Sequence, residues 1–423
     1  MRRMTYDEAL KYMLELPAGG YGSSLKSTEE LLSLMNNPHN DLKFIHVAGT
    51  NGKGSTCAML ASVFKTAGYK TGMFTTPYLI RFNEIMQING EPISDDDFAA
   101  LVTYTKTMVD VMSHQPSRFV VATAMCMRYF KDNGCDIVIL ETGVGGIDDP
   151  TNVVKNVEAA VITAIDIDHA ASLGHNIESI TKAKAGIIKP GCDVIFYGCN
   201  PIASRVIQDK CCLVGARYHE VDRVNRWDSQ FYSSNLIGFH QFFNRALVLK
   251  TLEVLRNKYS LLCEVYINEG LKNTKWPGRF ETLLADPTFI FDGAHNPHGV
   301  KAAVDTVKSR YPFSKIILIM GVMRDKDVES MVDILVRNVD VVHTVTPDHP
   351  RAMNAIDLAQ VFARRAKRKT YITPQYRIKD AVFNSIKEAR KEKDCIVLAL
   401  GSFHIYKDIV ENVKLHTVFL RKE

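Results

Sequence analysis

The stretch from Phe44 to Lys65 constrains the fold of this chain more than any other part of the sequence. Phe44–Ala48 is an apolar run that predicts a strand, and residues 56–65 predict a helix. Between them lies the glycine-rich turn Gly49-Thr50-Asn51-Gly52-Lys53-Gly54-Ser55. Glycines let several backbone N–H groups face one anion, and the helix dipole adds positive potential there. This order of elements therefore predicts a phosphate-binding loop.

The loop departs from the common pattern G-x-x-x-x-G-K-[ST] at two positions. The first glycine of that pattern would fall at Val47, whereas here it is Gly49. Gly54 follows Lys53 where the pattern has a hydroxyl residue. Lys53 can still reach the outer phosphates of a nucleotide as a point charge. We therefore expect a hydroxyl ligand for magnesium to come from another part of the chain.

Length, composition and charge exclude several classes of protein. The chain has 423 residues, 46% hydrophobic and 23% charged, as in a globular protein of two or three domains. It has no run of about 18 apolar residues, and Met1–Glu8 is not followed by the apolar core of a signal peptide. Nine scattered cysteines without a C-x-x-C pair favour reduced thiols, and a net charge of +5 suits a small anionic substrate better than a duplex nucleic acid. We expect a cytoplasmic monomer that binds neither membrane nor nucleic acid.

Strands alternate with helices along most of the chain, which predicts an α/β fold with largely parallel sheets. Residues 1–285 are interpreted as an ATP-binding domain of the P-loop ATPase type. Its expected elements, besides the strand and helix of the phosphate loop, are strands 71–75, 136–141, 159–165 and 193–197 and helices 94–112, 118–133 and 241–258. The polar, alternating stretch 214–238 predicts antiparallel strands at the sheet edge or a small accessory sheet.

A second alternating series begins near residue 288 and predicts a Rossmann-like, doubly wound domain over residues 286–423. Its expected elements are strands 289–291, 315–320, 339–343 and 395–400 and helices near 299–310, 327–338, 355–368 and 378–392. We place the boundary between the two domains near Leu284–Pro287.

Polar side chains follow three of the expected strands at their carboxyl ends. Glu141 ends one strand, Thr76 follows another, and Asp168 and His169 follow a third. Ligands of open α/β sheets gather at this edge, so these residues and Lys53 are expected to converge around a nucleotide triphosphate. Glutamate and threonine oxygens suit Mg²⁺, and the histidine suits a second divalent ion or a phosphate.

Each of these residues alone also has a structural interpretation. A single glutamate at a strand end is most often a solvated loop residue, a single histidine is more often structural, and Asp168 can cap a turn. Lys184 near a helix end fits surface decoration, and Asp292 and His295 fit a turn after a strand as well as contacts to a ribose or base. Together with the phosphate loop, the strand-end residues favour the functional interpretation.

The chain resembles the folylpolyglutamate synthases and dihydrofolate synthases, which belong to the ATP-dependent Mur ligases. The resemblance covers essentially the whole chain and rests on short motifs in a fixed order. These motifs are His46–Ser55, Thr75–Leu79, Arg81–Glu84, Glu141–Gly146, Thr151–Val153, Asp168-His169, Lys184–Ile187, His240-Gln241 with Asn244, Trp276–Arg279 and Asp292–Pro297.

The resemblance implies roles for residues of both domains. ATP would be bound by Thr50, Asn51, Gly52, Lys53, Gly54, Ser55, Asn244, Arg279, Asp292 and His295. Mg²⁺ would be held by Thr76, Glu141, His169 and a carbamylated Lys184, and the catalytic set would be Lys53, Glu141, His169 and Lys184. Carbamylation needs a neutral amine and hence a lowered lysine pKa. A monovalent cation such as K⁺ is a further candidate cofactor, and Asp325 and Ser402 are the candidates for binding L-glutamate.

The activity implied by the resemblance is amide ligation. An acceptor carboxylate attacks the γ-phosphate of ATP and forms an acyl phosphate, and the amine of glutamate then attacks the acyl carbon and expels phosphate. Two anions meet in the first step, so Lys53, Arg279 and the metal ions must neutralise charge. A hinge near residue 285 would let the domains close for the second step.

Four positions depart from the family pattern on the side where a pterin-bearing acceptor would sit. Tyr78 replaces a histidine, Ile85 and Ile147 replace arginines, and Pro150 replaces an alanine. These departures leave two hypotheses open: a folate–glutamate ligase, with or without dihydropteroate as a second acceptor, and a ligase of the same family for another acid or amine. The phosphate loop by itself also permits a nucleotide-binding module without ligation. The second α/β domain and the Asp292–His295 motif speak against the last hypothesis.

Overall fold

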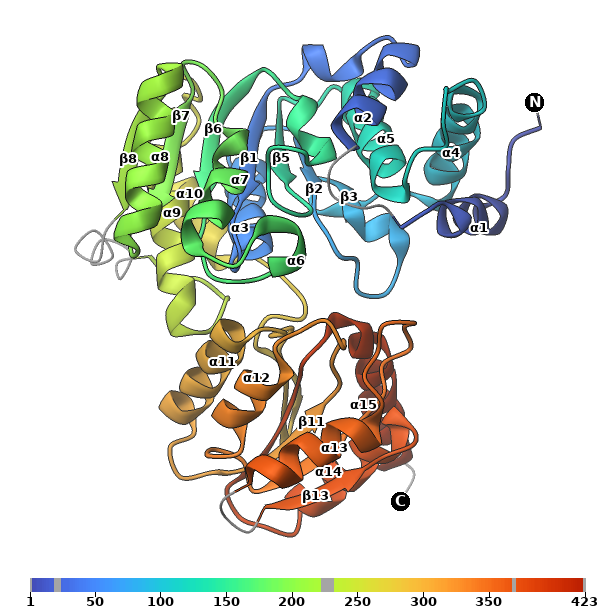
Figure 1. Ribbon diagram of the computed structural model, residues 1–423, viewed down its shortest axis with the longest axis vertical. Coiled ribbons are helices and arrows are strands. Elements are labelled where there is room, and N and C mark those ends of the chain that lie inside the picture. The colour runs from blue at the N-terminus through green and yellow to red at the C-terminus, as the bar shows by residue number, and fades with distance from the viewer. Residues whose placement is uncertain (1, 19–23, 222–231, 367–369, 421–423) are drawn as a thin grey trace. The chain divides into compact units, whose positions relative to one another are not determined.

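The computed structural model describes residues 2–18, 24–221, 232–366 and 370–420. The chain forms two compact units, each with its own sheet (Figure 1). The first unit contains Met1–Asn235 and Gln241–Lys275, and the second contains Leu236–His240 and Trp276–Glu423. The units part ahead of the expected boundary at residue 285, because strand β9 (Glu281–Ala285) pairs with the second sheet.

The first unit is built on an eight-stranded sheet in the order β4-β3-β2-β5-β1-β6-β7-β8. Its strands are β1 (Phe44–Ala48), β2 (Thr71–Phe74), β3 (Met86–Ile88), β4 (Glu91–Pro92), β5 (Ile137–Glu141), β6 (Val157–Ile162), β7 (Asp193–Tyr197) and β8 (Arg217–Val221). In this order, the six neighbouring strands β2, β5, β1, β6, β7 and β8 pair in parallel. β3 and β4 add an antiparallel edge beside β2. The α-helices that begin before residue 275 are α1 (Tyr6–Glu15), α2 (Ser24–Leu34), α3 (Lys53–Thr66), α4 (Asp95–Val109), α5 (Arg118–Asp132), α6 (Ala170–Leu173), α7 (Ile177–Lys184), α8 (Pro201–Val214), α9 (Phe239–Leu255) and α10 (Glu264–Lys272).

Local sequence explains most of these elements. Every residue of β1, β5 and β7 is buried, as expected for continuous apolar strands covered on both faces of a sheet. Ser94 caps α4 by accepting a hydrogen bond from the Asp97 N–H, and Ser117 caps α5 in the same way from Val120. The two long helices expected after residue 94 therefore begin directly after their capping serines.

The stretch near residue 214 differs from its prediction. β8 pairs with β7 in parallel, not antiparallel, and the antiparallel strands β3 and β4 lie at the other edge of the same sheet. The polar alternation of β8 reflects ion pairs across the ladder: Arg217 Nη2 lies 2.6 Å from Asp193 Oδ2, and His219 Nε2 lies 2.9 Å from Asp193 Oδ1. The rest of the stretch lies partly outside the described residues, which resume at 232.

The second unit is built on a six-stranded sheet in the order β13-β12-β11-β14-β10-β9, parallel except for β9. Besides β9, its strands are β10 (Thr288–Phe291), β11 (Lys315–Met320), β12 (Val341–Thr344), β13 (Tyr371–Pro374) and β14 (Cys395–Leu400). Its α-helices are α11 (Pro297–Arg310), α12 (Val328–Leu335), α13 (Ala355–Arg365), α14 (Ile378–Ala389) and α15 (Tyr406–Leu420). This arrangement confirms the predicted α/β class with two mostly parallel sheets.

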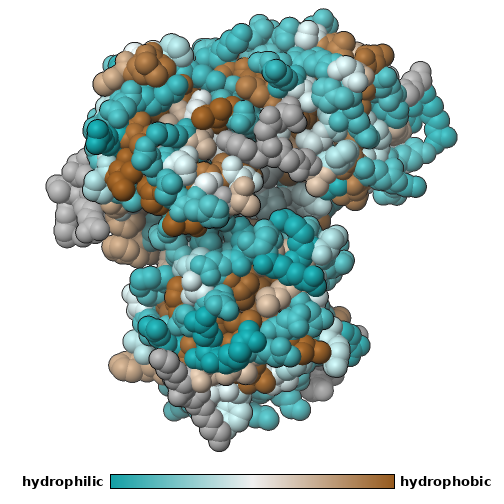
Figure 2. Space-filling model, viewed as in Figure 1, coloured by the Kyte–Doolittle hydropathy of each residue, from teal (hydrophilic) through white to brown (hydrophobic). Residues whose placement is uncertain are grey.

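A helix that spans a bilayer must be both long and apolar. None of the helices in the described ranges is both long and apolar enough to cross a membrane. On the face drawn in Figure 2, apolar residues form small groups between hydrophilic ones. Single exposed apolar side chains such as Leu213 and Phe313 are normal on a globular surface.

Candidate active site

The phosphate loop requires glycine at two positions. Gly49 has a φ of +153°, and a Cβ atom there would lie 1.8 Å from Thr163 Oγ1. Gly52 has a φ of +92°, and its Cβ would lie 2.3 Å from Asn244 Oδ1. Both glycines therefore allow a backbone conformation and a close approach that a side chain would prevent. The loop is held to the sheet because Thr50 N–H donates to Ala164 O at 2.8 Å.

Lys53 begins α3 and turns back over the loop. Its Nζ donates to Gly49 O at 3.2 Å and to Thr50 O at 3.4 Å. Gly52 is the N-cap of α3 and has no side chain to cap the helix, so the first N–H groups of α3 are free of a side-chain cap. A helix start with these properties is an anion site, and the lysine adds a positive charge beside it.

Asn244 joins the phosphate loop through a second amide. Its Nδ2 donates to Gln241 Oε1 at 2.9 Å, and Gln241 Nε2 lies 3.3 Å from Ser55 Oγ. All three side chains are buried. The structure thus brings the predicted nucleotide residue Asn244, from α9, onto the loop, and it adds Gln241, to which the sequence assigned no specific role.

Glu141 and Thr76 meet at the carboxyl ends of neighbouring strands. Glu141 ends β5, is 4% exposed, and accepts a hydrogen bond from the Thr76 N–H at 3.2 Å through Oε2. Thr76 follows β2, which pairs with β5 in parallel. The register of β1 and β5 sets Val47, just before the loop, opposite Glu141. The strand-end rule therefore predicted this meeting correctly.

His169 lies in a tight turn after β6 and is exposed. Its φ is +52°, its N–H donates to Asp168 Oδ1 at 2.8 Å, and its carbonyl accepts from the Ser172 N–H at 2.9 Å. Asp168 thus accepts a backbone N–H within this turn, and the metal-binding role of His169 stays a prediction.

The residues present fit a magnesium ion better than a metal held wholly by protein. Across the described part of the chain, no three His, Cys, Asp or Glu side chains form a metal-binding group. Mg²⁺ does not need such a group, because it keeps waters and phosphate oxygens and takes one or two carboxylates from the protein. The buried carboxylate of Glu141, beside Thr76, is such a donor.

Lys184 is a buried amine in contact with the phosphate loop. It is 4% exposed, and its Nζ donates to Gly49 O at 2.7 Å. Burial, and then the positive charge of Lys53, lower the pKa of Lys184 to about 7, against the opposing influence of Asp168 and Asp149. A large share of this amine is therefore neutral near pH 7, and the surface interpretation of Lys184 is wrong.

In the second unit, Asp292, Arg279 and His295 gather around Gly293. Asp292 is buried and accepts the N–H groups of Phe280 and Ala294, each at 2.8 Å. Burial raises the pKa of Asp292, and the positive charge of Arg279 opposes that rise. His295 Nδ1 lies 2.8 Å from Gly293 O, and a Cβ on Gly293 would lie 2.5 Å from Arg279 Nη1.

The two glutamate candidates lie in different local settings of the second unit. Asp325 Oδ2 pairs with Arg351 Nη1 at 3.1 Å, and the Ser402 hydroxyl accepts the His404 N–H at 3.2 Å. The rings of His349 and His404 are tilted by 41° against each other with centroids 4.5 Å apart, and the Arg351 N–H donates to His349 Nδ1 at 3.1 Å. Arg351 and the two histidines were not predicted from the sequence. The rule that polar residues after a strand form the site would have found residues 348–351, which follow β12.

Three of the positions that depart from the family pattern, Tyr78, Ile85 and Ile147, have different environments. Tyr78 and Ile147 are exposed, at 37% and 46% respectively. Ile85 is 3% exposed and belongs to the main core, so it presents no surface to a substrate. Only Tyr78 and Ile147, of these three, can shape an acceptor pocket.

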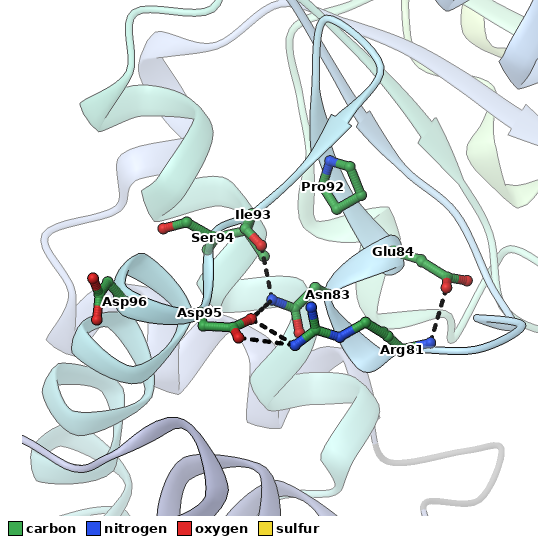
Figure 3. Close-up of a pocket in the computed structure, with 8 residues that line it drawn as sticks. All are labelled: Arg81, Asn83, Glu84, Pro92, Ile93, Ser94, Asp95 and Asp96. Carbon is green, nitrogen blue, oxygen red and sulfur yellow. Dashed lines mark hydrogen bonds and ion pairs between the residues drawn. The ribbon is translucent and has the colours of Figure 1, made fainter.

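A cavity of about 570 Å³ lies at the start of α4 (Figure 3). Its charged side chains are occupied: Arg81 Nη2 pairs with both carboxylate oxygens of Asp95, at 2.7 and 2.9 Å. Glu84 accepts the N–H groups of Leu79 and Arg81 at 2.7 and 2.8 Å. These groups stabilise the turn that follows Thr76, and none of the predicted site residues lines this cavity.

Comparison with known families defines the class of this fold and site. The family profile described as "Mur ligase middle domain" matches residues 47–207, and "Mur ligase, glutamate ligase domain" matches residues 278–403. These two profiles cover the phosphate loop, Glu141 and Lys184 in the first unit and Arg279 to His295 in the second. The chain is thus a Mur ligase, an ATP-dependent enzyme that forms carbon–nitrogen bonds.

Individual relatives narrow the class. The chain is 34% identical over 421 residues to "Dihydrofolate synthase/folylpolyglutamate synthase" of Bacillus subtilis, covering 93% of this chain and 96% of that one. It is 31% identical to "Folylpolyglutamate synthase" of Lacticaseibacillus casei, covering 83% and 87%. The solved structure "E.coli FolC in complex with DHPP and ADP" is similar with a TM-score of 0.86 at 25% identity, covering 98% and 99%. The chain belongs to the folylpolyglutamate synthase and dihydrofolate synthase family.

Proposed function

We propose that this enzyme joins L-glutamate to a folate, the reaction named for its relatives. The observation that carries the proposal is the Gly49 carbonyl, which accepts hydrogen bonds from both Lys53 and Lys184, at 3.2 and 2.7 Å. It brings the amines of two lysines to one phosphate loop, next to the strand that ends in Glu141. Lys53 lies at the anion-binding start of α3, and the lowered pKa of Lys184 makes the neutral form of its amine available.

The first chemical step joins two anions. A carboxylate oxygen of the acceptor bonds to the γ-phosphorus of ATP as the bond to the β-phosphate oxygen breaks, which gives an acyl phosphate and ADP. The N–H groups at the start of α3 and the ammonium of Lys53 would stabilise the charge that builds on the phosphate oxygens. The amine of glutamate then bonds to the acyl carbon, inorganic phosphate leaves, and the amine loses a proton.

Glu141, Thr76, His169 and a carbamate on Lys184 would hold magnesium in this proposal. A bound Mg²⁺ would polarise phosphate oxygens as a Lewis acid. Glu141 offers a buried carboxylate oxygen already fixed by the Thr76 N–H. The neutral form of the Lys184 amine is the form that reacts with carbon dioxide, and its pKa of about 7 supports that role.

In the second unit we propose two sites. Arg279, Asp292 and His295 would contact the nucleotide, Arg279 as the cation. The Asp325–Arg351 pair, together with Ser402, would bind the incoming amino acid. An amino acid carries a carboxylate and an ammonium group. The guanidinium of Arg351 has the opposite charge to the first, and the carboxylate of Asp325 has the opposite charge to the second. The cytoplasmic location and the monomeric state also stay predictions.

Purified protein tests the proposal directly. The assay combines ATP, Mg²⁺ and L-glutamate with tetrahydrofolate or dihydropteroate, and it follows ADP release and the mass of the amide product. Lys53→Ala should abolish turnover, whereas Lys65→Ala, an exposed lysine later in α3, is the matched control. The substrate assignment fails if no ADP release depends on a folate-type acceptor.

A second candidate is ligation to a carboxylate that carries no pterin. The exposed apolar and aromatic side chains of Ile147 and Tyr78 favour it, because they replace the cation and the histidine usual in the family. A panel of carboxylate acceptors, ranked by kcat/KM for ADP release, separates the two candidates. The highest value with a folate rejects the second candidate, and an amide product with any acceptor rejects a binding module without ligation.

A further inference from the structure

Three buried side chains form a chain of hydrogen bonds inside the first unit. His46 lies in β1, just before the phosphate loop, and its Nε2 is 2.8 Å from Thr151 Oγ1. Thr151 Oγ1 is 2.5 Å from Asp149 Oδ1. His46 and Thr151 are 0% exposed and Asp149 is 2% exposed. No step of the proposed reaction uses these groups, although burying them is costly unless they are satisfied.

The surroundings fix the direction of every hydrogen bond in this chain. Asp149 accepts the Thr151 N–H on Oδ1 at 3.0 Å and the Val144 N–H on Oδ2 at 2.9 Å, so both oxygens act as acceptors. Burial raises the pKa of Asp149, and the hydrogen bonds from Thr151, Val144 and Gly143 oppose that rise. As a carboxylate, Asp149 only accepts, so the single hydroxyl hydrogen of Thr151 points to it. Burial and the charge of Lys189 lower the pKa of His46 to about 3, so the ring is neutral and carries one N–H. That N–H must be on Nε2 and donate to Thr151, and Nδ1 has no hydrogen-bond partner.

Asp149 holds the glycine-rich turn that follows Glu141. Besides accepting the Val144 N–H, its Oδ2 would lie 3.3 Å from a Cβ on Gly143, so the carboxylate packs directly on the turn. Backbone N–H groups converging on one carboxylate make a strong, directional anchor. Through Thr151 and His46, this anchor is tied to the strand that leads into the phosphate loop.

The same turn packs on the end of α7. The Ile147 N–H donates to Ala183 O at 2.9 Å. A Cβ on Gly146 would lie 2.8 Å from the carbonyl oxygens of both Ala183 and Lys184. Lys184 in turn donates to Gly49 O. The contacts form a closed circuit from β1 through the turn and α7 back to the phosphate loop.

We propose that Thr151 is a positioning residue, which acts through Asp149 and His46 to set where Glu141 and Lys184 stand relative to the phosphate loop. It touches no substrate. The functional part rests on the proposed ligase activity, in which Glu141 and Lys184 hold magnesium. Without the hydroxyl, the buried Asp149 carboxylate loses the hydrogen bond that Thr151 donates to it, and the His46 N–H has no acceptor. The backbone of the phosphate loop stays intact, so magnesium use and turnover should fall while ATP still binds.

The test compares two substitutions at one position. Thr151→Val keeps the shape and removes the hydroxyl, and Thr151→Ser keeps the hydroxyl. Thr105→Val is the matched control, a fully buried threonine in α4 that bonds only to Leu101 O. Thr151→Val should lower kcat and raise the Mg²⁺ concentration at half-saturation by about 10-fold, the lower end of the effect of losing a direct partner of a metal ligand, because Thr151 acts through Asp149 and His46. The KM for ATP should stay within about threefold, and Thr151→Ser and Thr105→Val should stay near wild type. A folded Thr151→Val enzyme with wild-type kcat and Mg²⁺ dependence overturns the proposal, as does a Thr151→Ser enzyme that is equally impaired.

A second measurement does not depend on ligation. Nitrogen-15 NMR of the imidazole side chains reports the tautomer of each histidine, and His46→Gln identifies the signals of His46 by their absence. Wild-type protein should show the Nε2–H tautomer, and Thr151→Val should shift the ring towards a mixture. An Nδ1–H tautomer in wild type refutes the hydrogen-bond chain even if Thr151→Val does not fold. If wild type releases no acceptor-dependent ADP, the ligase assignment fails, whereas the Nε2–H tautomer and its loss in Thr151→Val still support the positioning circuit.

Discussion

Gly52 is the position in the phosphate loop where a single methyl group should do most harm. Its backbone has φ +92° and ψ −9°, a conformation that residues with a side chain rarely adopt. A Cβ atom would lie 2.3 Å from Asn244 Oδ1, well inside contact distance. Gly52→Ala must therefore either displace the Asn244 amide, which is bonded to Gln241, or shift the loop backbone.

The size of the effect follows from three contributions. The left-handed backbone costs an alanine about 1–2 kcal/mol. Breaking the bond between Asn244 and Gln241 costs about 0.5–1.5 kcal/mol. The less flexible unfolded chain returns about 0.4–1 kcal/mol. The free energy of unfolding should therefore fall by about 1–3 kcal/mol.

Gly215→Ala is the matched control, because Gly215 caps α8 at φ +68° and a Cβ there meets nothing within 4 Å. Urea unfolding should show Gly52→Ala to be about 1 kcal/mol worse than Gly215→Ala, and the difference should vanish in an Asn244→Ala background. Calorimetry should show that Gly52→Ala weakens the binding of ATP at least about tenfold, which corresponds to about 1.4 kcal/mol of binding free energy. Equal stabilities of the two alanine variants together with unchanged ATP affinity would refute the clash as the cause.

Three further predictions concern charges. First, the pKa of Lys184 is lowered from 10.5 to about 7, so between these values the unfolded chain holds a proton that the folded chain lacks. In CO₂-free buffer, stability should rise with pH through that window by up to about 1.4 kcal/mol per unit for this group. Urea unfolding at pH 7 and 9 should show that Lys184→Met lowers the slope, and the part that remains comes from Lys189, because burial lowers its pKa to about 8. Second, Glu141→Gln keeps an acceptor for the Thr76 N–H, so the variant should stay folded while its Mg²⁺-dependent turnover falls at least about 100-fold. Unchanged turnover at saturating Mg²⁺ would show that Glu141 does not belong to the site. Third, Arg217→Ala leaves the buried Asp193 with His219 as its ion-pair partner, so the free energy of unfolding should fall by about 1–3 kcal/mol in thermal unfolding. The control Arg205→Ala removes an exposed arginine and should lower it by at most about 0.5 kcal/mol, and equal losses contradict the prediction.

The sequence predicts the parts of the fold that are written in local apolar runs. β1, β5 and β7 are such runs, and the strand-end rule then places Glu141 beside Thr76. β9 and β13 were not predicted, because their residues are largely exposed or half-buried and one ends in proline. The direction of β8 was predicted wrongly. Its polar alternation arises because alternate side chains face Asp193, and such a pattern is the same for a parallel and an antiparallel strand.

The candidate site shows a similar division. The glycines of the loop are visible in the sequence, and Gly49 and Gly52 are needed there for a positive φ, whereas the burial of Lys184 depends on packing by the distant turn at Gly146. A lysine at a helix end has the same local sequence whether it is exposed or enclosed. Ile85 is the converse case, since its position in a site motif suggested a pocket and its side chain lies in the core.

The shared carbonyl of Gly49 has a thermodynamic consequence. Because Lys53 and Lys184 donate to one oxygen, and the charge of Lys53 helps to lower the pKa of Lys184, neither group can change without affecting the other. A polyanion that draws Lys53 away from this oxygen, and adds negative charge nearby, makes it easier for Lys184 to bind a proton. Nucleotide binding and proton binding are then two coupled equilibria of one loop. ATP affinity must accordingly vary with pH around neutrality, even where no phosphate oxygen touches Lys184.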